Sequence, residues 1–137
     1  MTTTTVAPPL RGNTLGSGTT SFVMAEWHDP GGPVGERRLV APPHVHHRDD
    51  EAWYVLEGTL CVQLGEQIVE VRSGSGVLVP RGTRHTYWNP GPGPTRYLLI
   101  MTSNIYQLIQ EIHAMPERTP AALEAVFRKH DSQLVNP

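Results

Sequence analysis

The sequence has almost no cysteine and almost no lysine. Cys61 is the only cysteine among 137 residues, so no internal disulfide can form, and we interpret it as a small core or sheet residue. Lys129 is the only lysine, and a formal net charge of −2 without a basic stripe argues against nucleic acid as a partner. No apolar run approaches the roughly 18 residues that a membrane helix needs. These absences predict a protein of the reducing cytoplasm that binds neither nucleic acid nor a membrane.

The length of the chain predicts one domain with a substantial core and a shorter segment on each side. Residues 1–18 are rich in threonine, proline and glycine, and they lack the apolar stretch of a secretory signal. We therefore expect residues 1–18 to form a flexible N-terminal arm. Residues 19–102 are expected to form a β-barrel, and residues 103–137 a helical C-terminal tail.

Short β-rich segments alternate with turn residues along the predicted barrel. Clusters of glycine, proline and asparagine separate these segments at spacings near ten residues. The predicted strands cover residues 22–27, 37–41, 52–56, 59–64, 67–71, 77–79, 85–88 and 95–101. Such a pattern predicts an all-β fold, a sandwich or a barrel of antiparallel strands.

The apolar pattern changes to a helical period after residue 102. Asn104 and Gln107 form a possible capping box, and Pro116 would end this first helix. A second helix is predicted to begin at Thr119, with Pro120 at its first position. The apolar face of the first helix follows i, i+3, i+4 and i+7 spacing at Ile105, Leu108, Ile109 and Ile112. We expect both helices to pack on the outside of the sandwich or against a partner subunit.

Three histidines and one glutamate stand among the strand-forming residues. His44 and His46 are two positions apart, so both side chains point to the same face of a strand. Glu51 follows after a short polar loop, and His85 comes from a later strand. Three imidazoles and a carboxylate on one interior face suit one divalent transition metal per subunit. The donor set does not choose among iron, manganese, nickel, copper, cobalt and zinc.

The same residues resemble the two motifs of the cupin superfamily. The first motif, G-x5-H-x-H-x(3,4)-E-x6-G, fits His44, His46, Glu51 and Gly58. Arg38 stands where the leading glycine of this motif belongs, which affects only the approach turn. The second motif, G-x5-P-x-G-x2-H-x3-N, is matched at every position, by Gly74, Pro80, Gly82, His85 and Asn89.

This resemblance implies a fold, a substrate class and an assembly. The fold is the cupin jelly roll, a double-stranded β-helix of two packed antiparallel sheets, here with two C-terminal helices. The resemblance also implies a small-molecule substrate and a homodimer. Residues 22–27 are the best candidate for a strand exchanged between subunits, because this strand would otherwise leave an unpaired edge.

Strand alternation also predicts which residues lie beside the metal. Trp53 and Val55 share a face with Glu51, Tyr87 shares a face with His85, and Tyr97 is a further candidate. These residues would line an aromatic, apolar cavity, although ordinary core packing explains them as well. Glu51 either stays on the metal as its fourth ligand or acts as a base toward a substrate hydroxyl.

The remaining histidines and acids have simpler interpretations. His47 lies on the opposite face from His46 and is expected in solvent. Asp49 and Asp50 are expected to be solvated or paired with Arg48. The other three histidines fall outside both motifs and are expected at the surface; they are His28, His113 and His130.

Three functions compete at this stage. The resemblance is to small single-domain cupins grouped with quercetin 2,3-dioxygenases, which implies a metal-dependent dioxygenase acting on a flavonol, polyphenol or other small aromatic or enol substrate. The second function is non-oxidative metal-dependent chemistry, as an isomerase, cyclase or lyase on a polyketide-like or hydroxy-acid substrate. The third is a sensor that binds a small molecule, which would be favoured by a fused DNA-binding element; nothing in the sequence resembles a helix-turn-helix.

Overall fold

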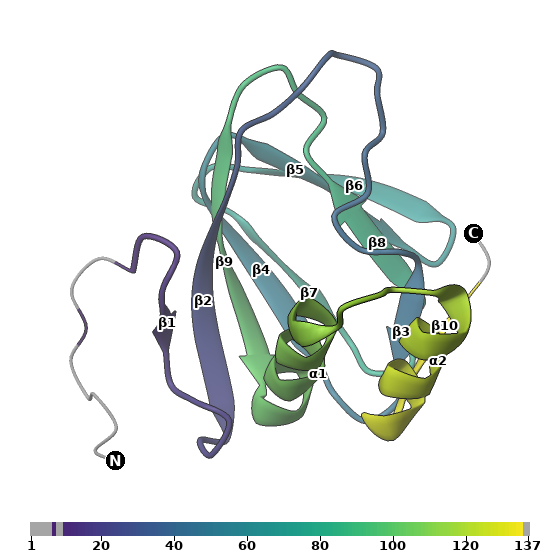
Figure 1. Cartoon of the computed structure of the whole chain (residues 1–137). Coiled ribbons are helices and arrows are strands. Elements are labelled where there is room, and N and C mark those ends of the chain that lie inside the picture. Colours follow the sequence, from purple (N-terminus) through teal and green to yellow (C-terminus); the bar gives the residue numbers. More distant parts are fainter. Residues whose placement is uncertain (1–6, 8–9, 136–137) are drawn as a thin grey trace.

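Two five-stranded antiparallel sheets pack against each other in the computed structural model, which describes residue 7 and residues 10–135 (Figure 1). The first sheet has the order β1 (Thr14–Leu15), β2 (Phe22–Asp29), β9 (Thr95–Thr102), β4 (Glu51–Glu57) and β7 (Gly76–Val79). The second has the order β10 (Ser132–Leu134), β3 (His44–His46), β8 (His85–Trp88), β5 (Thr59–Leu64) and β6 (Gln67–Arg72). This architecture confirms the predicted all-β sandwich.

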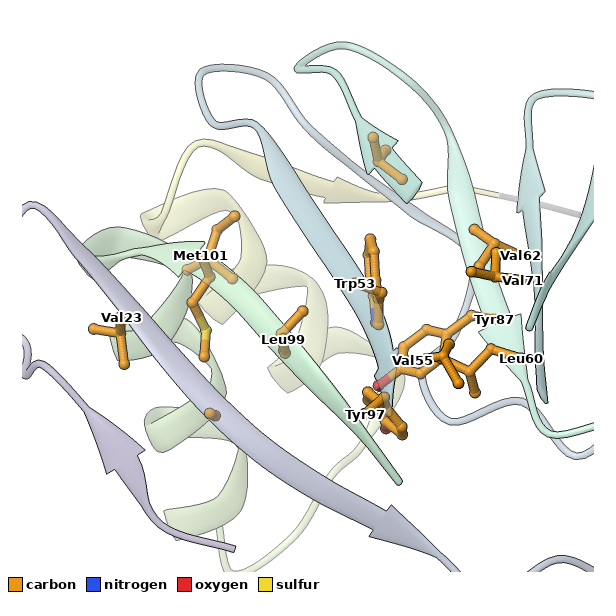
Figure 2. Packing of buried hydrophobic residues seen from close by; sticks show 13 residues of the cluster. Val23, Trp53, Val55, Leu60, Val62, Val71, Tyr87, Tyr97, Leu99 and Met101 are labelled. Carbon is orange, nitrogen blue, oxygen red and sulfur yellow. Dashed lines mark hydrogen bonds between the residues drawn. The ribbon is translucent and has the colours of Figure 1, made fainter. Parts of the chain in front are cut away.

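The hydrophobic core lies between the sheets and follows the two-residue alternation of the strands. In β9 every second residue is buried, which turns Tyr97, Leu99 and Met101 inward. Trp53 and Tyr87 come from opposite sheets, and their ring centroids lie 5.1 Å apart (Figure 2). Aromatic and branched side chains thus fill the interior, as the predicted strand faces require.

Gly58 makes the crossing from β4 in the first sheet to β5 in the second. Its φ is +80°, a conformation that residues with a Cβ rarely adopt. A Cβ at this position would lie 2.3 Å from the carbonyl oxygen of Pro94. A glycine is therefore required here both by the backbone conformation and by the neighbouring chain.

The two helices are α1 (Ser103–Ala114) and α2 (Pro120–Lys129). The predicted start of α2 is confirmed: Thr119 caps it by accepting a hydrogen bond from Ala122 N, and Pro120 occupies its first turn. The predicted capping box of α1 was wrong. Thr102 caps α1 instead, with its side chain accepting from Ile105 N.

Several predicted elements differ from those in the structure. Residues 37–41 form no named strand, and only a bridge between Leu39 and Trp88 is present there. The sequence analysis missed β10, and it also missed β1, which lies within the segment assigned to the arm. Residues 1–6 and 8–9 of that arm lie outside the described residues, and the boundary at residue 18 stays a prediction. β1 pairs with Met24 and Ala25 of β2 and so covers part of this edge, and the exchange of the β2 strand between subunits stays a prediction.

Candidate metal centre

Four donor side chains from both sheets meet in the interior. His44 and His46 stand on β3, and His85, the first residue of β8, is the cross-strand partner of His44. Glu51 begins β4 in the other sheet. All four residues are buried, and one ligand atom from each lies within 4.8 Å of the others. The structure thus brings together the four proposed ligands, and this group could hold a metal ion.

Hydrogen bonds connect the turn before β8 to β3 and to the loop before β4. Gly82 N donates a hydrogen bond of 2.7 Å to His46 O, which ties the turn to β3. Arg81 donates from its backbone N to Asp50 Oδ1 at 2.8 Å and from its guanidinium to Asp50 Oδ2 at 3.1 Å. Arg81, rather than the predicted Arg48, is therefore the partner of Asp50. These contacts hold the loop before β4 and the turn before β8 together, and with them the donors that follow each.

Two of the imidazoles direct Nδ1 away from the cluster. His44 Nδ1 lies 2.7 Å from the carbonyl oxygen of Pro42, and His85 Nδ1 lies 2.9 Å from that of Thr83. Since a carbonyl oxygen can only accept, both Nδ1 atoms carry the proton in the neutral ring. Nε2 of each ring then presents a lone pair to the centre of the cluster.

The third imidazole is oriented by a residue that the sequence analysis missed. His46 Nδ1 lies 2.7 Å from Ser132 Oγ, and Ser132 Oγ lies 3.1 Å from the carbonyl oxygen of His130. A hydroxyl has one proton, which goes to the carbonyl oxygen, so Ser132 accepts from Nδ1–H of His46. Nε2 of His46 is therefore unprotonated as well. Ser132 reaches this position because β10 pairs with β3 in register Ser132 to His46.

The donor atoms are spaced as ligands of one ion. His44 Nε2 lies 3.1 Å from His46 Nε2, and Glu51 Oε1 lies 3.2 Å from His85 Nε2 and 3.4 Å from His46 Nε2. Donor atoms about 2.1 Å from a transition ion, at right angles to each other, lie roughly 3 Å apart. A cation between these four lone pairs would balance their mutual repulsion. The residues present therefore fit a divalent transition metal.

The protonation states of the cluster suit the same role. Burial, together with the nearby His85 and His46, lowers the pKa of His44 to about 3. Burial acts to raise the pKa of Glu51, but the rings of His46 and His85, within 3.4 Å of its carboxylate, lower it to about 2. His44 is neutral and Glu51 is ionised at neutral pH. These are the forms in which imidazole and carboxylate bind a metal.

A cavity of about 250 Å³ adjoins the donor cluster. Three of the donors, His44, His46 and Glu51, line it, and its other walls are mostly apolar. Trp53 and Tyr87 line it from the sheets, which agrees with the predicted strand faces. Residues of the two helices complete it, and these are Ile105, Leu108, Ile109, Ile112, His113, Leu123 and Phe127.

The helices were expected to pack on the outside of the sandwich or against a partner subunit, and in the structure their apolar faces pack over the cavity. Phe127 of α2 is buried with its ring 5.3 Å from that of His44, and Ile105 and Leu108 of α1 are also buried. Helical periodicity identified the apolar face of α1 correctly. It could not show that this face covers a cavity, because other walls of the cavity, such as His44 and Trp53, come from segments distant in sequence.

The four proposed substrate residues do not share one environment. Trp53 and Tyr87 line the cavity, whereas Val55 and Tyr97 are buried in the core and are absent from its lining (Figure 2). The hydroxyls of Tyr87 and Tyr97 lie 2.9 Å apart and hydrogen-bond to each other. Burial raises the pKa of Tyr87 well above its usual value, so its hydroxyl stays protonated.

The histidines outside the motifs were predicted at the surface, which was wrong for one of them. His47, His28 and His113 are exposed. His130 is buried at the C-terminal end of α2, where its Nδ1 lies 2.9 Å from Asn104 Oδ1. The Asn104 amide in turn donates to Asp49 Oδ2 at 2.8 Å and to His130 O at 2.9 Å, so Asn104 joins both helices to the loop before β4.

Comparison with known protein families gives a match over the part of the chain that carries the four candidate ligands. Residues 34–101 match the family model described as "Cupin domain". They include all four donors. The chain contains a domain of the cupin superfamily. The predicted jelly-roll fold is thereby confirmed for the described part of the chain.

Relatives and solved structures extend the comparison without fixing an activity. The uncharacterised protein MJ1618 of Methanocaldococcus jannaschii is 33% identical over 66 residues, which are 48% of this chain and 50% of that protein. The oxidoreductase iacF of Pestalotiopsis fici is 32% identical over 81 residues, 58% of this chain and 39% of that protein. The cupin chain thus spans half or less of the length of these two relatives.

One solved structure shows the same fold at low sequence identity. It is an uncharacterised conserved protein with a double-stranded β-helix domain from Klebsiella pneumoniae, with a TM-score of 0.54 and 22% identity. The match covers 66% of this chain and 74% of that one. At this identity the match concerns the fold alone. No helix in the described part of the chain has the length and apolar character needed to cross a membrane.

Proposed function

We propose that this cupin is a metal-dependent oxidoreductase, a dioxygenase that acts on a small aromatic or enol substrate. The observation that carries the proposal is the convergence of three imidazole Nε2 atoms and one carboxylate beside an apolar cavity. Four protein donors leave open positions on a six-coordinate ion, which distinguishes a reactive site from a closed structural one. A bound ion would supply Lewis acidity and, if it is redox-active, electron transfer to dioxygen.

Residues of this chain would bind the substrate and control the transfer of its proton. Trp53 and Tyr87 would form aromatic walls of the substrate site beside the donors. Val55 and Tyr97 would pack behind these walls and support them. The apolar helix residues exclude water, which strengthens electrostatic contacts inside the cavity. Glu51 is kept ionised by His46 and His85. We therefore favour a role for Glu51 as a metal ligand over a role as a base.

The similarity to the oxidoreductase iacF supports an oxidative reaction, and the motif resemblance supports the quercetin dioxygenase-like group. The non-oxidative alternative uses the same donors, with the protonated hydroxyl of Tyr87 as a possible proton carrier. We place the enzyme in the cytoplasm as a homodimer. Light scattering tests the assembly, and a monomeric mass would refute it.

Oxygen consumption by protein of known metal content tests the proposed function. Protein purified without added metal is analysed for its elements and then assayed with a panel of flavonols and catechols. His46→Ala should abolish metal retention and oxygen uptake, whereas His47→Ala, which changes the exposed neighbour, should retain both. Turnover under argon with zinc as the only metal would refute the dioxygenase and favour the non-oxidative alternative.

A further inference from the structure

The residues that line the cavity carry an unbalanced charge. Among the described lining residues, Glu51 is the only carboxylate and Arg118 is the only permanent cation. Glu51 is already engaged by His46 and His85 at 3.4 and 3.2 Å. A divalent ion in the donor cluster would leave that end with a net charge of +1, so Arg118 would bring the cavity to +2.

Arg118 is an exposed residue of the cavity lining, and a hydrogen bond to the neighbouring chain holds its side chain. It lies in the segment between α1 and α2, which passes from the side of the first sheet to β3 and β10 of the second (Figure 1). Its Nε donates to Ile112 O at 3.2 Å near the C-terminal end of α1. Within the described part of the chain, Arg118 forms no ion pair. One N–H of the guanidinium is therefore anchored, while the remaining donors are available to a ligand.

We infer that the cavity selects a small amphipathic anion, with oxygen atoms at the donor cluster, an apolar body along the helices, and a carboxylate at Arg118. This inference rests on the proposed function, since it assumes that the cavity is the substrate site. A guanidinium binds a carboxylate through two parallel hydrogen bonds, which neither a neutral amide nor an ester can match. Arg118 is exposed, so these two parallel hydrogen bonds, rather than exclusion of water, would carry the preference.

Binding of matched acids and amides tests the inference. The probes are catechols that carry a carboxylate on zero, one or two methylene groups, each compared with its primary amide. The titrations use zinc-loaded protein under argon, so that no oxidation occurs. At least one acid should bind roughly 10-fold or more tightly than its amide. The number of methylene groups in that acid then indicates how far Arg118 lies from the bound catechol.

Two variants assign the preference to Arg118. Arg118→Gln should reduce the acid-to-amide ratio to within about two-fold, and Arg118→Lys should keep part of it. Arg128→Gln is the matched control, because Arg128 is an exposed arginine of α2 that pairs with Glu124 and does not line the cavity. Far-UV circular dichroism and zinc content establish that each variant is folded and loaded.

Three outcomes would overturn the inference: equal binding of acids and amides by the wild type, no binding of any acid, or an unchanged ratio in Arg118→Gln. The titration is independent of turnover. Absence of oxygen uptake would therefore refute the dioxygenase while the charge preference stands, and loss of the preference would leave the dioxygenase untouched.

Discussion

Ser132 Oγ lies 2.7 Å from His46 Nδ1, although 86 residues separate the two in the sequence. The contact joins β10, which follows the second helix, to β3, which carries two of the candidate metal donors. It fixes the ring orientation and the tautomer of His46, because the single hydroxyl proton is used by His130 O. The C-terminal segment is thus a supporting part of the candidate metal centre.

Ser132→Ala should therefore weaken metal binding. Loss of the hydrogen bond frees the His46 ring, and outer contacts of this kind typically change metal affinity by about 10- to 100-fold. The affinity is measured by competition with a chelator of known strength. Ser73→Ala is the matched control, because Ser73 also donates to a backbone carbonyl but lies away from the cluster. Equal affinities in the wild type and a folded Ser132→Ala variant would contradict the prediction.

Glu51→Gln should lower metal occupancy as well as activity. The low pKa of Glu51 marks it as a permanent anion, which suits a ligand and makes it a weak base. The substituted amide would present a neutral oxygen of similar shape, so metal retention after dialysis should fall clearly below that of the wild type. Glu66→Gln, at an exposed glutamate between β5 and β6, should retain metal. Full occupancy in Glu51→Gln with a large loss of turnover would assign Glu51 as a base instead.

The metal-free protein should lose stability as the pH falls from about 6.5 toward 3. The pKa of His44 is about 3 in the folded chain and 6.5 in the unfolded one, so the unfolded chain binds more protons in this window. Stability is therefore complete above the unfolded value and declines at lower pH, by on the order of 3 kcal/mol at pH 4. Urea unfolding with chelator present at pH 7 and pH 4 measures the difference.

The pH prediction has an internal control in the same chain. His44→Gln removes the titrating ring and should flatten the dependence, apart from the part that Glu51 adds below about pH 4.5. His47→Ala removes an exposed ring and should leave the dependence unchanged. Equal urea midpoints of the wild type at pH 7 and pH 4 would show that burial does not keep His44 neutral.

Gly58→Ala should destabilise the fold more than Gly65→Ala does. Both glycines have positive φ, but a Cβ at position 58 would meet Pro94 O at 2.3 Å, whereas position 65 faces open space. We expect about 1 kcal/mol for Gly65→Ala from its conformation alone, and roughly 3 kcal/mol or more for Gly58→Ala. Chemical denaturation of the two variants measures this order. Similar losses of stability in the two variants would show that the β4–β5 connection can accommodate a side chain at position 58.

Local patterns in the sequence determined much of the fold and the candidate metal donors. Alternation predicted the inward faces of β4 and β9, turn residues separated the strands, and Thr119–Pro120 marked the start of α2. The spacing of His44 and His46 placed both on one strand face. These features are readable because they depend on neighbours a few residues apart, whose geometry the backbone alone sets.

Only the tertiary structure decided which distant segments complete the site. Ser132 and Arg118 carry no local signal, since each gains its place from a pairing or packing between elements far apart in the chain. Val55 and Tyr97 have the predicted faces but lie away from the cavity, because alternation gives the side of a sheet and not the position along it. His130 is buried for the same reason: long-range packing, rather than its own neighbours in sequence, removes it from solvent.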